Sequence, residues 1–185
     1  MGDSSRPSPD SVEYSTPWFE LVSKQVGGAK YYSLRMVDYV TVVAITTTRE
    51  IVLVRQYRPA VDQFTLELPS GHVEKNQTPE DSARSELSEE TGFTCPRFEL
   101  LGTLLSDTGR NQNKTWCYMA LDVVPPSASW VHEEGIEVVL VPVDRAPQMI
   151  LGGELGHALN VAALMLAALR HTIFGVGNGT MNLPR

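Results

Sequence analysis

The chain has 185 residues, which is the length of about one domain and enough to bury a sizeable hydrophobic core. Aspartate and glutamate number 22 against 15 lysines and arginines. The resulting formal charge of -7 argues against a nonspecific nucleic-acid binder, which needs basic side chains to neutralise phosphates. The 2 cysteines make no disulfide framework, so we expect reduced thiols in a cytoplasmic protein.

Both ends of the chain are expected to be flexible. Residues 1–17 are rich in serine, proline and aspartate and lack the apolar stretch of a signal peptide, so they predict a flexible leader. Residues 175–185 contain closely spaced glycines and predict a flexible tail. The most apolar segment, 159–169, is interrupted by Asn160 and is shorter than the roughly 20 residues that span a bilayer. We therefore expect no membrane role and a single domain over residues 18–174.

The first part of this domain predicts β-strands. Segments rich in β-branched and aromatic residues are separated by a glycine pair or by a short polar turn. The predicted strands occupy residues 18–22, 30–34, 39–47 and 51–57. The first two would form a hairpin around Gly27 and Gly28.

A helix with clear start and stop signals follows. Thr78 before Pro79 is typical of an N-cap followed by a proline in the first helical position, and Asp81 completes a spacing that resembles a capping box. Gly92 is typical of the left-handed residue that ends a helix. The sequence therefore predicts a loop, a helix and a second loop.

Three carboxylates gather near the end of this helix. Glu86, Glu89 and Glu90 lie three or four residues apart and project from one face, while Ala83 and Leu87 form an apolar stripe elsewhere. Like charges this close repel unless a cation neutralises them, and magnesium is typically held by one or two carboxylates together with substrate phosphates. A solvated acidic face would give the same pattern, so the surroundings decide between the two.

Further strands and a closing helix complete the predicted domain. Strand patterns cover residues 99–105, 115–121 and 136–141, and an apolar stripe of helical period covers residues 157–171. This order predicts an α/β fold in which a mixed sheet is covered by helices on both sides.

The segment from Gly71 to Phe93 resembles the signature box of the Nudix hydrolases. The matching residues are Gly71, Glu86, Leu87, Glu89, Glu90, Gly92 and Phe93. Gln77 and Ser85 depart from the pattern, because the family has there a glutamate and an arginine that brace the loop against the helix. Because the glutamate and the arginine are both absent here, neither charge is left without its partner. Glu80 and Arg84, at i and i+4, offer a substitute ion pair.

Segments on both sides of the box resemble the branch of this family that cleaves ADP-ribose and related nucleoside diphosphate sugars. They are residues 54–59, 67–71 and 136–142. The resemblance implies a Nudix-type α/β/α sandwich and a magnesium-dependent pyrophosphohydrolase, with manganese as an alternative cation. Its substrate would be a nucleoside diphosphate linked to a sugar, with ADP-ribose the leading candidate, and its products a nucleoside monophosphate and a sugar phosphate. It also implies a homodimer with the early strands exchanged, which makes residues 18–34 a candidate dimerisation hairpin.

The same resemblance implies roles for individual residues in the chemistry. Glu86, Glu89 and Glu90, with the backbone carbonyl of Ser70, would hold the metal, and Glu89 counts also among the catalytic residues. For the base that takes the proton of the attacking water, a glutamate in the loop before the last strand is expected. Glu134 is the first choice and Glu133 the second, with two ordinary loop acids as the alternative.

Four residues are candidates for substrate binding. Arg58 would contact a substrate phosphate, with a surface salt bridge as the alternative. Trp18 would stack on a nucleobase, with core packing as the alternative. Gly71 permits close approach of the backbone, and Arg110 lies in a loop that would reach the distal sugar.

Two other functions are compatible with the sequence. One is a Nudix-fold module that binds a nucleotide with weak or no catalysis, which the departures at Gln77 and Ser85 would favour. The other is a hydrolase of a different nucleoside polyphosphate. A panel of substrates separates them, because the fold alone does not name the leaving group.

Overall fold

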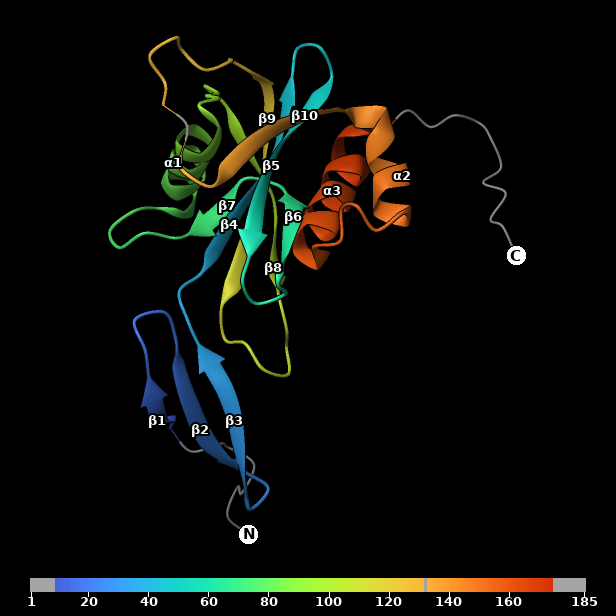
Figure 1. The fold of residues 1–185 in the computed structure, drawn as a ribbon. Helices are drawn as coiled ribbons and strands as arrows, with labels where there is room; N and C mark the ends of the chain where they lie inside the picture. Colours follow the sequence, from blue (N-terminus) through green and yellow to red (C-terminus); the bar gives the residue numbers. More distant parts are fainter. Residues whose placement is uncertain (1–8, 132, 175–185) are drawn as a thin grey trace, which may run out of the picture.

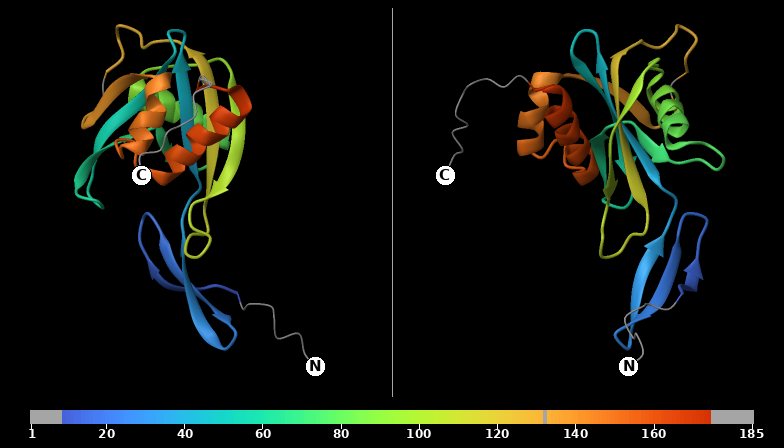
Figure 2. Two further views of the ribbon diagram at one scale, coloured as in Figure 1. Left: turned by 90° about the vertical axis from the view of Figure 1, so that its right-hand side faces the viewer. Right: turned by 180° about the vertical axis from the view of Figure 1, so that it is seen from behind.

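The computed structural model describes residues 9–131 and 133–174. These residues form a seven-stranded sheet with helices on both faces and a separate three-stranded sheet that extends from one end (Figures 1 and 2). The predicted α/β class and the mixed sheet between helices are confirmed. The predicted tail at 175–185 and the first eight residues of the predicted leader lie outside the described residues.

The three-stranded sheet is antiparallel, in the order β1 (Ser11–Ser15), β2 (Glu20–Val26) and β3 (Ala29–Arg35). Its first strand shows that the prediction of a flexible leader is wrong for residues 11–15. All five residues of β1 are exposed, so the strand carries no apolar alternation that would have revealed it. Backbone pairing with β2 holds it in place, as does the salt bridge between Glu13 and Lys30, whose oxygen and nitrogen lie 2.7 Å apart.

The large sheet has the central strand order β10-β5-β4-β9-β8, and two short strands extend it. Only β4 and β9 run parallel, so the sheet is mixed. The strands are β4 (Tyr39–Thr46), β5 (Glu50–Arg58), β6 (Gln63–Glu67), β7 (Ser70–His72), β8 (Phe98–Leu105), β9 (Lys114–Val123) and β10 (Ile136–Pro142).

The sheet divides between β4 and β5. These two strands pair only at Ile45 and Ile51, after which β5 continues with β6 and β4 continues with β7. Leu68 and Pro69 cross from one branch to the other, and the N–H of Val42 donates to the carbonyl oxygen of Pro69 at 2.9 Å. The crossing segment therefore anchors the part of the chain that leads into the box.

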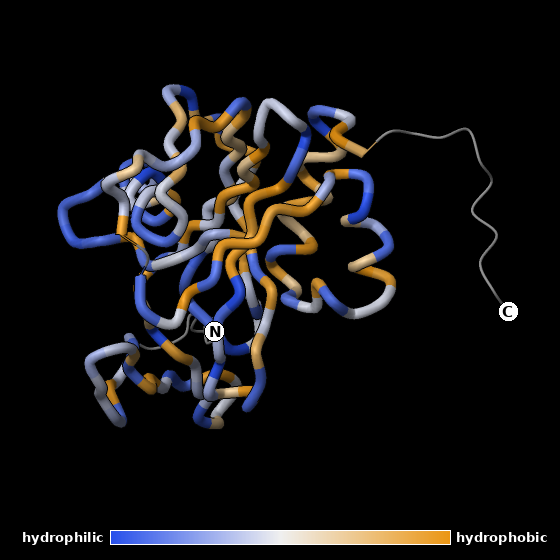
Figure 3. The backbone as a smooth tube through the Cα atoms, turned by 45° about the horizontal axis from the view of Figure 1, so that its top comes forward, coloured by the Kyte–Doolittle hydropathy of each residue, from blue (hydrophilic) through white to orange (hydrophobic). Residues whose placement is uncertain are grey.

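Helices cover the sheet on opposite faces (Figure 1). On one face lies α1 (Pro79–Thr91), and on the other lie α2 (Ala146–Leu151) and α3 (Ala158–His171), with a 3-10 turn at Val143–Arg145 before α2. Each face has its own cluster of buried apolar side chains, and Figure 3 shows the most hydrophobic backbone along the central strands between them. No helix in the described part of the chain is both long and apolar enough to cross a membrane.

The start and stop signals of α1 are confirmed. The Thr78 side chain accepts a hydrogen bond from the Asp81 N–H at 3.1 Å, and Asp81 returns a contact to the N–H of Thr78. Gly92 ends the helix in the left-handed region with φ of 71°. Ala83 and Leu87 are fully buried, and Glu90 is buried on the same side of the helix, so the expectation that the carboxylates lie away from the apolar stripe is wrong for Glu90.

Candidate active site

Two carboxylates of α1 press against the strand that precedes it. Glu90 is only 7% exposed, and its Oε2 accepts a hydrogen bond from the backbone N–H of Ser70 at 3.0 Å. A Cβ at Gly71 would lie 1.8 Å from Oε1 of Glu86, so only glycine leaves room for that carboxylate. The glycine that opens the box is therefore required by the glutamate that it faces.

Glu86 and Glu90 both have strongly raised pKa values. Burial raises the pKa of Glu86 to about 7, with further contributions from the negative charges of Glu89 and Glu133. Burial also raises the pKa of Glu90 to about 8, although the hydrogen bond from Ser70 lowers it. A cation beside these groups would relieve the desolvation and the repulsion together.

The arrangement fits a hard divalent cation bound in part by substrate. Among the residues that the structure describes, no three acidic, histidine or cysteine side chains converge to enclose an ion. Magnesium does not require such a cage, because it usually keeps several waters and binds one or two carboxylates plus substrate phosphates. Buried Glu90 and half-buried Glu86 would supply two oxygen ligands, whereas Glu89 is exposed at the rim.

The loop before β10 approaches this cluster at Glu133. The negative charge of Glu133 contributes to the raised pKa of both Glu86 and Glu90. Glu134 is not among the main causes of either shift. Glu133 is thus the loop acid whose charge acts more strongly on the two carboxylates.

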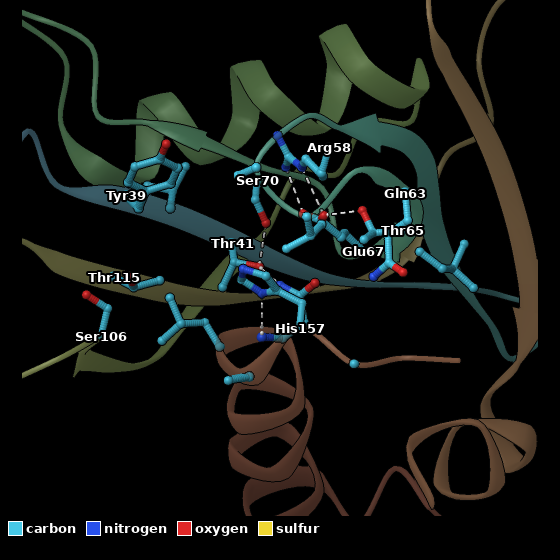
Figure 4. A pocket seen from close by; sticks show the side chains of 18 of the residues that line it. Tyr39, Thr41, Arg58, Gln63, Thr65, Glu67, Ser70, Ser106, Thr115 and His157 are labelled. Atoms are coloured by element: carbon cyan, nitrogen blue, oxygen red, sulfur yellow. Dashed lines mark hydrogen bonds and ion pairs between the residues drawn. The ribbon is translucent and has the colours of Figure 1, made fainter. Parts of the chain in front are cut away.

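A cavity of about 840 Å³ opens beside the cluster (Figure 4). Its walls come from β4, from β6 and the turn that leads into it, from Ser70 in β7, from the loop between β8 and β9, and from the start of α3. Glu86 and Glu90 are not part of its lining, but Ser70 belongs to the lining and holds Glu90 through its N–H. The cavity is large enough for a ligand of nucleotide size.

Arg58 faces this cavity in a fixed position. Its Nε and Nη2 donate to the two carboxylate oxygens of Glu67 at 2.9 and 2.7 Å, and Thr65 donates to the same carboxylate at 2.6 Å (Figure 4). Burial raises the pKa of Glu67, yet these hydrogen bonds outweigh it and leave the pKa below its ordinary value. A salt bridge, the alternative expected for Arg58, is therefore present. It uses two of the three guanidinium nitrogens and leaves Nη1 to meet a phosphate.

Two predicted substrate-binding residues lie elsewhere. Trp18 is 69% exposed in the turn between β1 and β2, so the alternative of core packing is wrong, and it does not line the cavity of its own chain. Arg110 is exposed with its guanidinium 5.9 Å from the centre of the Tyr31 ring, where the loop between β8 and β9 meets β3. Asn111 and Asn113 of the same loop do line the cavity.

The departures from the box at Gln77 and Ser85 have a structural counterpart. The Ser82 hydroxyl donates to Oε1 of Gln77 at 2.8 Å and accepts from the N–H of Glu74 at 3.1 Å, which ties the loop to α1 without charge. The expected pair of Glu80 and Arg84 is also present at 2.7 Å. Arg84 in addition donates to the carbonyl of Cys95 at 2.7 Å, so it braces the far end of the helix.

Some lining residues were not predicted as part of the site. His157 and Asn160 line the cavity at the start of α3, and Glu67 holds Arg58. A signal existed for Asn160, because a polar residue in an otherwise apolar helix usually marks buried hydrogen bonds. His157 precedes the helix as its N-cap and had no comparable signal in the sequence.

Comparison with known proteins agrees with this geometry. The family model for the NUDIX domain matches residues 36–160. An ADP-ribose pyrophosphatase of Bacillus subtilis is 26% identical over 72% of this chain and 74% of its own length, and one of Escherichia coli K12 is 30% identical over 66% and 63%. A methanol dehydrogenase activator of Bacillus methanolicus is 29% identical over 72% and 74%.

A solved structure described as that of an ADP compounds hydrolase shares the fold. Its TM-score is 0.73 at 22% identity, with 89% of this chain and 94% of the other covered. The family match includes both the glutamates of α1 and the walls of the cavity. The chain therefore belongs to the Nudix hydrolases and resembles their ADP-ribose pyrophosphatase branch.

Proposed function

We propose that the chain is a divalent-metal-dependent pyrophosphohydrolase of nucleoside diphosphate sugars, with ADP-ribose as the leading candidate substrate. The observation that carries the proposal is the pair of carboxylates, half-buried Glu86 and buried Glu90, set against Gly71 and Ser70 at the edge of a cavity of about 840 Å³. The relatives named ADP-ribose pyrophosphatases support this choice of substrate.

In this proposal each group of the chain has a separate task. Magnesium or manganese, held by Glu86 and Glu90 with the carbonyl of Ser70 and with Glu89 at the rim, would offset charge on the diphosphate and favour ionisation of the attacking water. Arg58, fixed by Glu67, would orient the diphosphate. Glu133 would take the proton of the water, and the products are a nucleoside monophosphate and a sugar phosphate.

We place Glu133 ahead of Glu134 as the base because its charge acts more strongly on the two carboxylates. The change Glu133→Gln should lower kcat by about a hundredfold or more, the usual contribution of a general base, with a small effect on KM. Glu134→Gln is the matched control, one residue away in the same exposed loop, and should keep most of the turnover. The reverse ranking of the two variants would restore the original choice of Glu134.

The function is tested with a substrate panel. Purified protein is incubated with magnesium and ADP-ribose, GDP-mannose, UDP-glucose, nucleoside triphosphates or dinucleoside polyphosphates, and release of monophosphate is measured. Preference for a nucleotide sugar supports the proposal, and preference for triphosphates selects a different Nudix hydrolase. Binding without hydrolysis in calorimetry selects the nucleotide-binding module.

The setting of the enzyme is also part of the proposal. Residues 11–174 would act as one unit, with the three-stranded sheet joining two copies into a homodimer whose sites draw on both subunits. The two cysteines are free and buried, which suits a reducing cytoplasm, where we place the protein. Its ligand would be a small nucleoside diphosphate derivative rather than a nucleic acid, because the formal charge is -7.

A further inference from the structure

A buried asparagine on α3 contacts the segment that crosses between the two branches of the sheet. Asn160 is 1% exposed and lies in the first turn of α3, across the sheet from α1. Its Oδ1 accepts a hydrogen bond from the N–H of Leu68 at 2.9 Å, and its Nδ2 lies 3.4 Å from Oγ1 of Thr41. Because the Leu68 N–H can only donate, it fixes which end of the amide faces the crossing segment.

These contacts close into a ring. Oγ1 of Thr41 lies 2.8 Å from Oγ of Ser70 (Figure 4). Oγ of Ser70 also lies 2.8 Å from the carbonyl oxygen of Leu68. Each hydroxyl has one proton to donate. Asn160 and Ser70 therefore both donate to Oγ1 of Thr41, the Ser70 hydroxyl shares its proton between Thr41 and the carbonyl oxygen of Leu68, and the Leu68 N–H donates back to Asn160.

The ring fixes the residue that holds the buried carboxylate. Ser70 uses its side chain inside the ring and its backbone N–H outside it, where that N–H donates to Oε2 of Glu90 at 3.0 Å. A continuous hydrogen-bonded path thus runs from α3 through the sheet to Glu90 on α1. Supporting groups of this kind set the orientation of metal ligands and commonly change metal affinity when they are removed.

We propose that Asn160 is a positioning residue that holds Ser70, and through it Glu90, ready for the divalent cation. The inference rests on the proposed function only in giving that cation a role in catalysis. It concerns binding of the metal itself, which can be measured without any nucleotide.

The main test replaces Asn160 by leucine, which is similar in size and removes both polar contacts. Binding of Mn²⁺ to the full chain is measured by calorimetry and by electron paramagnetic resonance, without nucleotide. Asn160→Leu should weaken Mn²⁺ binding by about tenfold or more. With an active substrate, kcat should fall and excess Mn²⁺ should restore part of it, while KM for the nucleotide sugar changes less.

A second pair of variants keeps the test decisive if Asn160→Leu does not fold. Thr41→Val preserves shape and removes the hydroxyl from the ring, whereas Thr41→Ser keeps the hydroxyl. Thr41→Val should weaken Mn²⁺ binding and Thr41→Ser should not. The double variant with Asn160→Leu should be little worse than either single one, because both changes open the same ring.

Leu164→Ala is the control for general loss of stability. Leu164 is fully buried one turn further along α3, takes no part in the ring, and its truncation should destabilise the fold while leaving Mn²⁺ affinity unchanged. The proposal is overturned if Asn160→Leu and Thr41→Val bind Mn²⁺ as tightly as wild type does. It is also overturned if Glu90→Gln abolishes none of the Mn²⁺ binding that wild type shows. Failure of the substrate panel with intact Mn²⁺ effects would reject the proposed function alone.

Discussion

Gly71 and Glu86 share a space that admits no further atom. The backbone at Gly71 does not adopt a positive φ, so alanine is excluded there by contact with Glu86 and not by strain. The obstructing atoms belong to the end of a flexible side chain, which can move away.

Gly71→Ala should therefore leave the fold intact and displace the carboxylate. We expect thermal stability within a few degrees of wild type and a loss of about tenfold or more in Mn²⁺ affinity and turnover. Gly109→Ala is a matched control in an exposed loop, where the added Cβ would lie 3.3 Å from the end of the Asp107 side chain. Unchanged turnover in Gly71→Ala would remove Glu86 from the metal site.

The raised pKa values predict how stability depends on pH. Glu86 and Glu90 have folded-state pKa values of about 7 and about 8 against an ordinary value of 4.5, so between these values the folded chain binds more protons than the unfolded chain. Their contribution to the free energy of unfolding falls as pH rises from 4.5 to 8. Without metal, Tm should drop by about 3 °C or more between pH 6 and pH 9.

Magnesium should counteract this loss, and more strongly at high pH, because it binds the deprotonated carboxylates. Differential scanning calorimetry with and without magnesium measures both effects. Glu90→Gln should flatten the pH dependence and reduce the stabilisation by magnesium. A metal-free Tm that rises between pH 6 and pH 9 would contradict the assignment.

At the scale of elements, α1 depends on an uncharged link to the preceding loop. Ser82 is 1% exposed and joins Gln77 to Glu74 through one hydroxyl. Ser82→Ala should lower the free energy of unfolding by about 1 kcal/mol, since it leaves polar partners of a buried hydroxyl unsatisfied. Ser85→Ala, on the same helix, removes a hydroxyl without a hydrogen bond to any described residue and should be nearly neutral in urea denaturation.

The sequence predicted elements with strong local signals and missed those held by pairing alone. The cap at Thr78, the stop at Gly92 and the burial of Leu87 all follow from local rules, and the structure confirms them. β6 and β7 are short and only partly buried, so they lack a periodicity that could be recognised. They exist because β5 and β4 offer them free edges.

The candidate site shows the same division between local and distant information. The three glutamates and Gly71 could be found because they occupy one continuous box. The pairing of Arg58 with Glu67 and the contact of Ser70 with Asn160 through Thr41 join residues far apart or on different elements. No spacing rule in a single sequence predicts such contacts.

At the scale of the whole molecule, the three-stranded sheet requires cover. No helix of the described chain packs on it, and it exposes large apolar side chains, among them Tyr14 at 62% and Tyr32 at 44%. Small isolated sheets are marginally stable and exposed apolar patches mark interfaces. These features support the proposed homodimer, in which Trp18 of one subunit would serve the cavity of the other.

Mixing two inactive variants tests this arrangement. Trp18→Ala and Glu90→Gln subunits, refolded together, should recover about a quarter of the wild-type sites, because half of randomly formed dimers are mixed and each holds one complete site. Sedimentation velocity should show a dimer, and exposed Leu169→Ala on α3 should leave that dimer unchanged. No recovery of activity on mixing would place Trp18 outside the neighbouring site.

The division between β4 and β5 has a consequence for engineering this enzyme. A continuous ladder along these strands would satisfy more backbone groups and stabilise the chain, yet it would fill the room in which a substrate must lie. Stabilising substitutions selected at high temperature should therefore avoid the division between β4 and β5 and occur in α2, in α3 and on the surface. Variants in which β4 and β5 pair along their whole length should be more thermostable and inactive. The enzyme therefore has to keep this opening, although it lowers the stability of the fold.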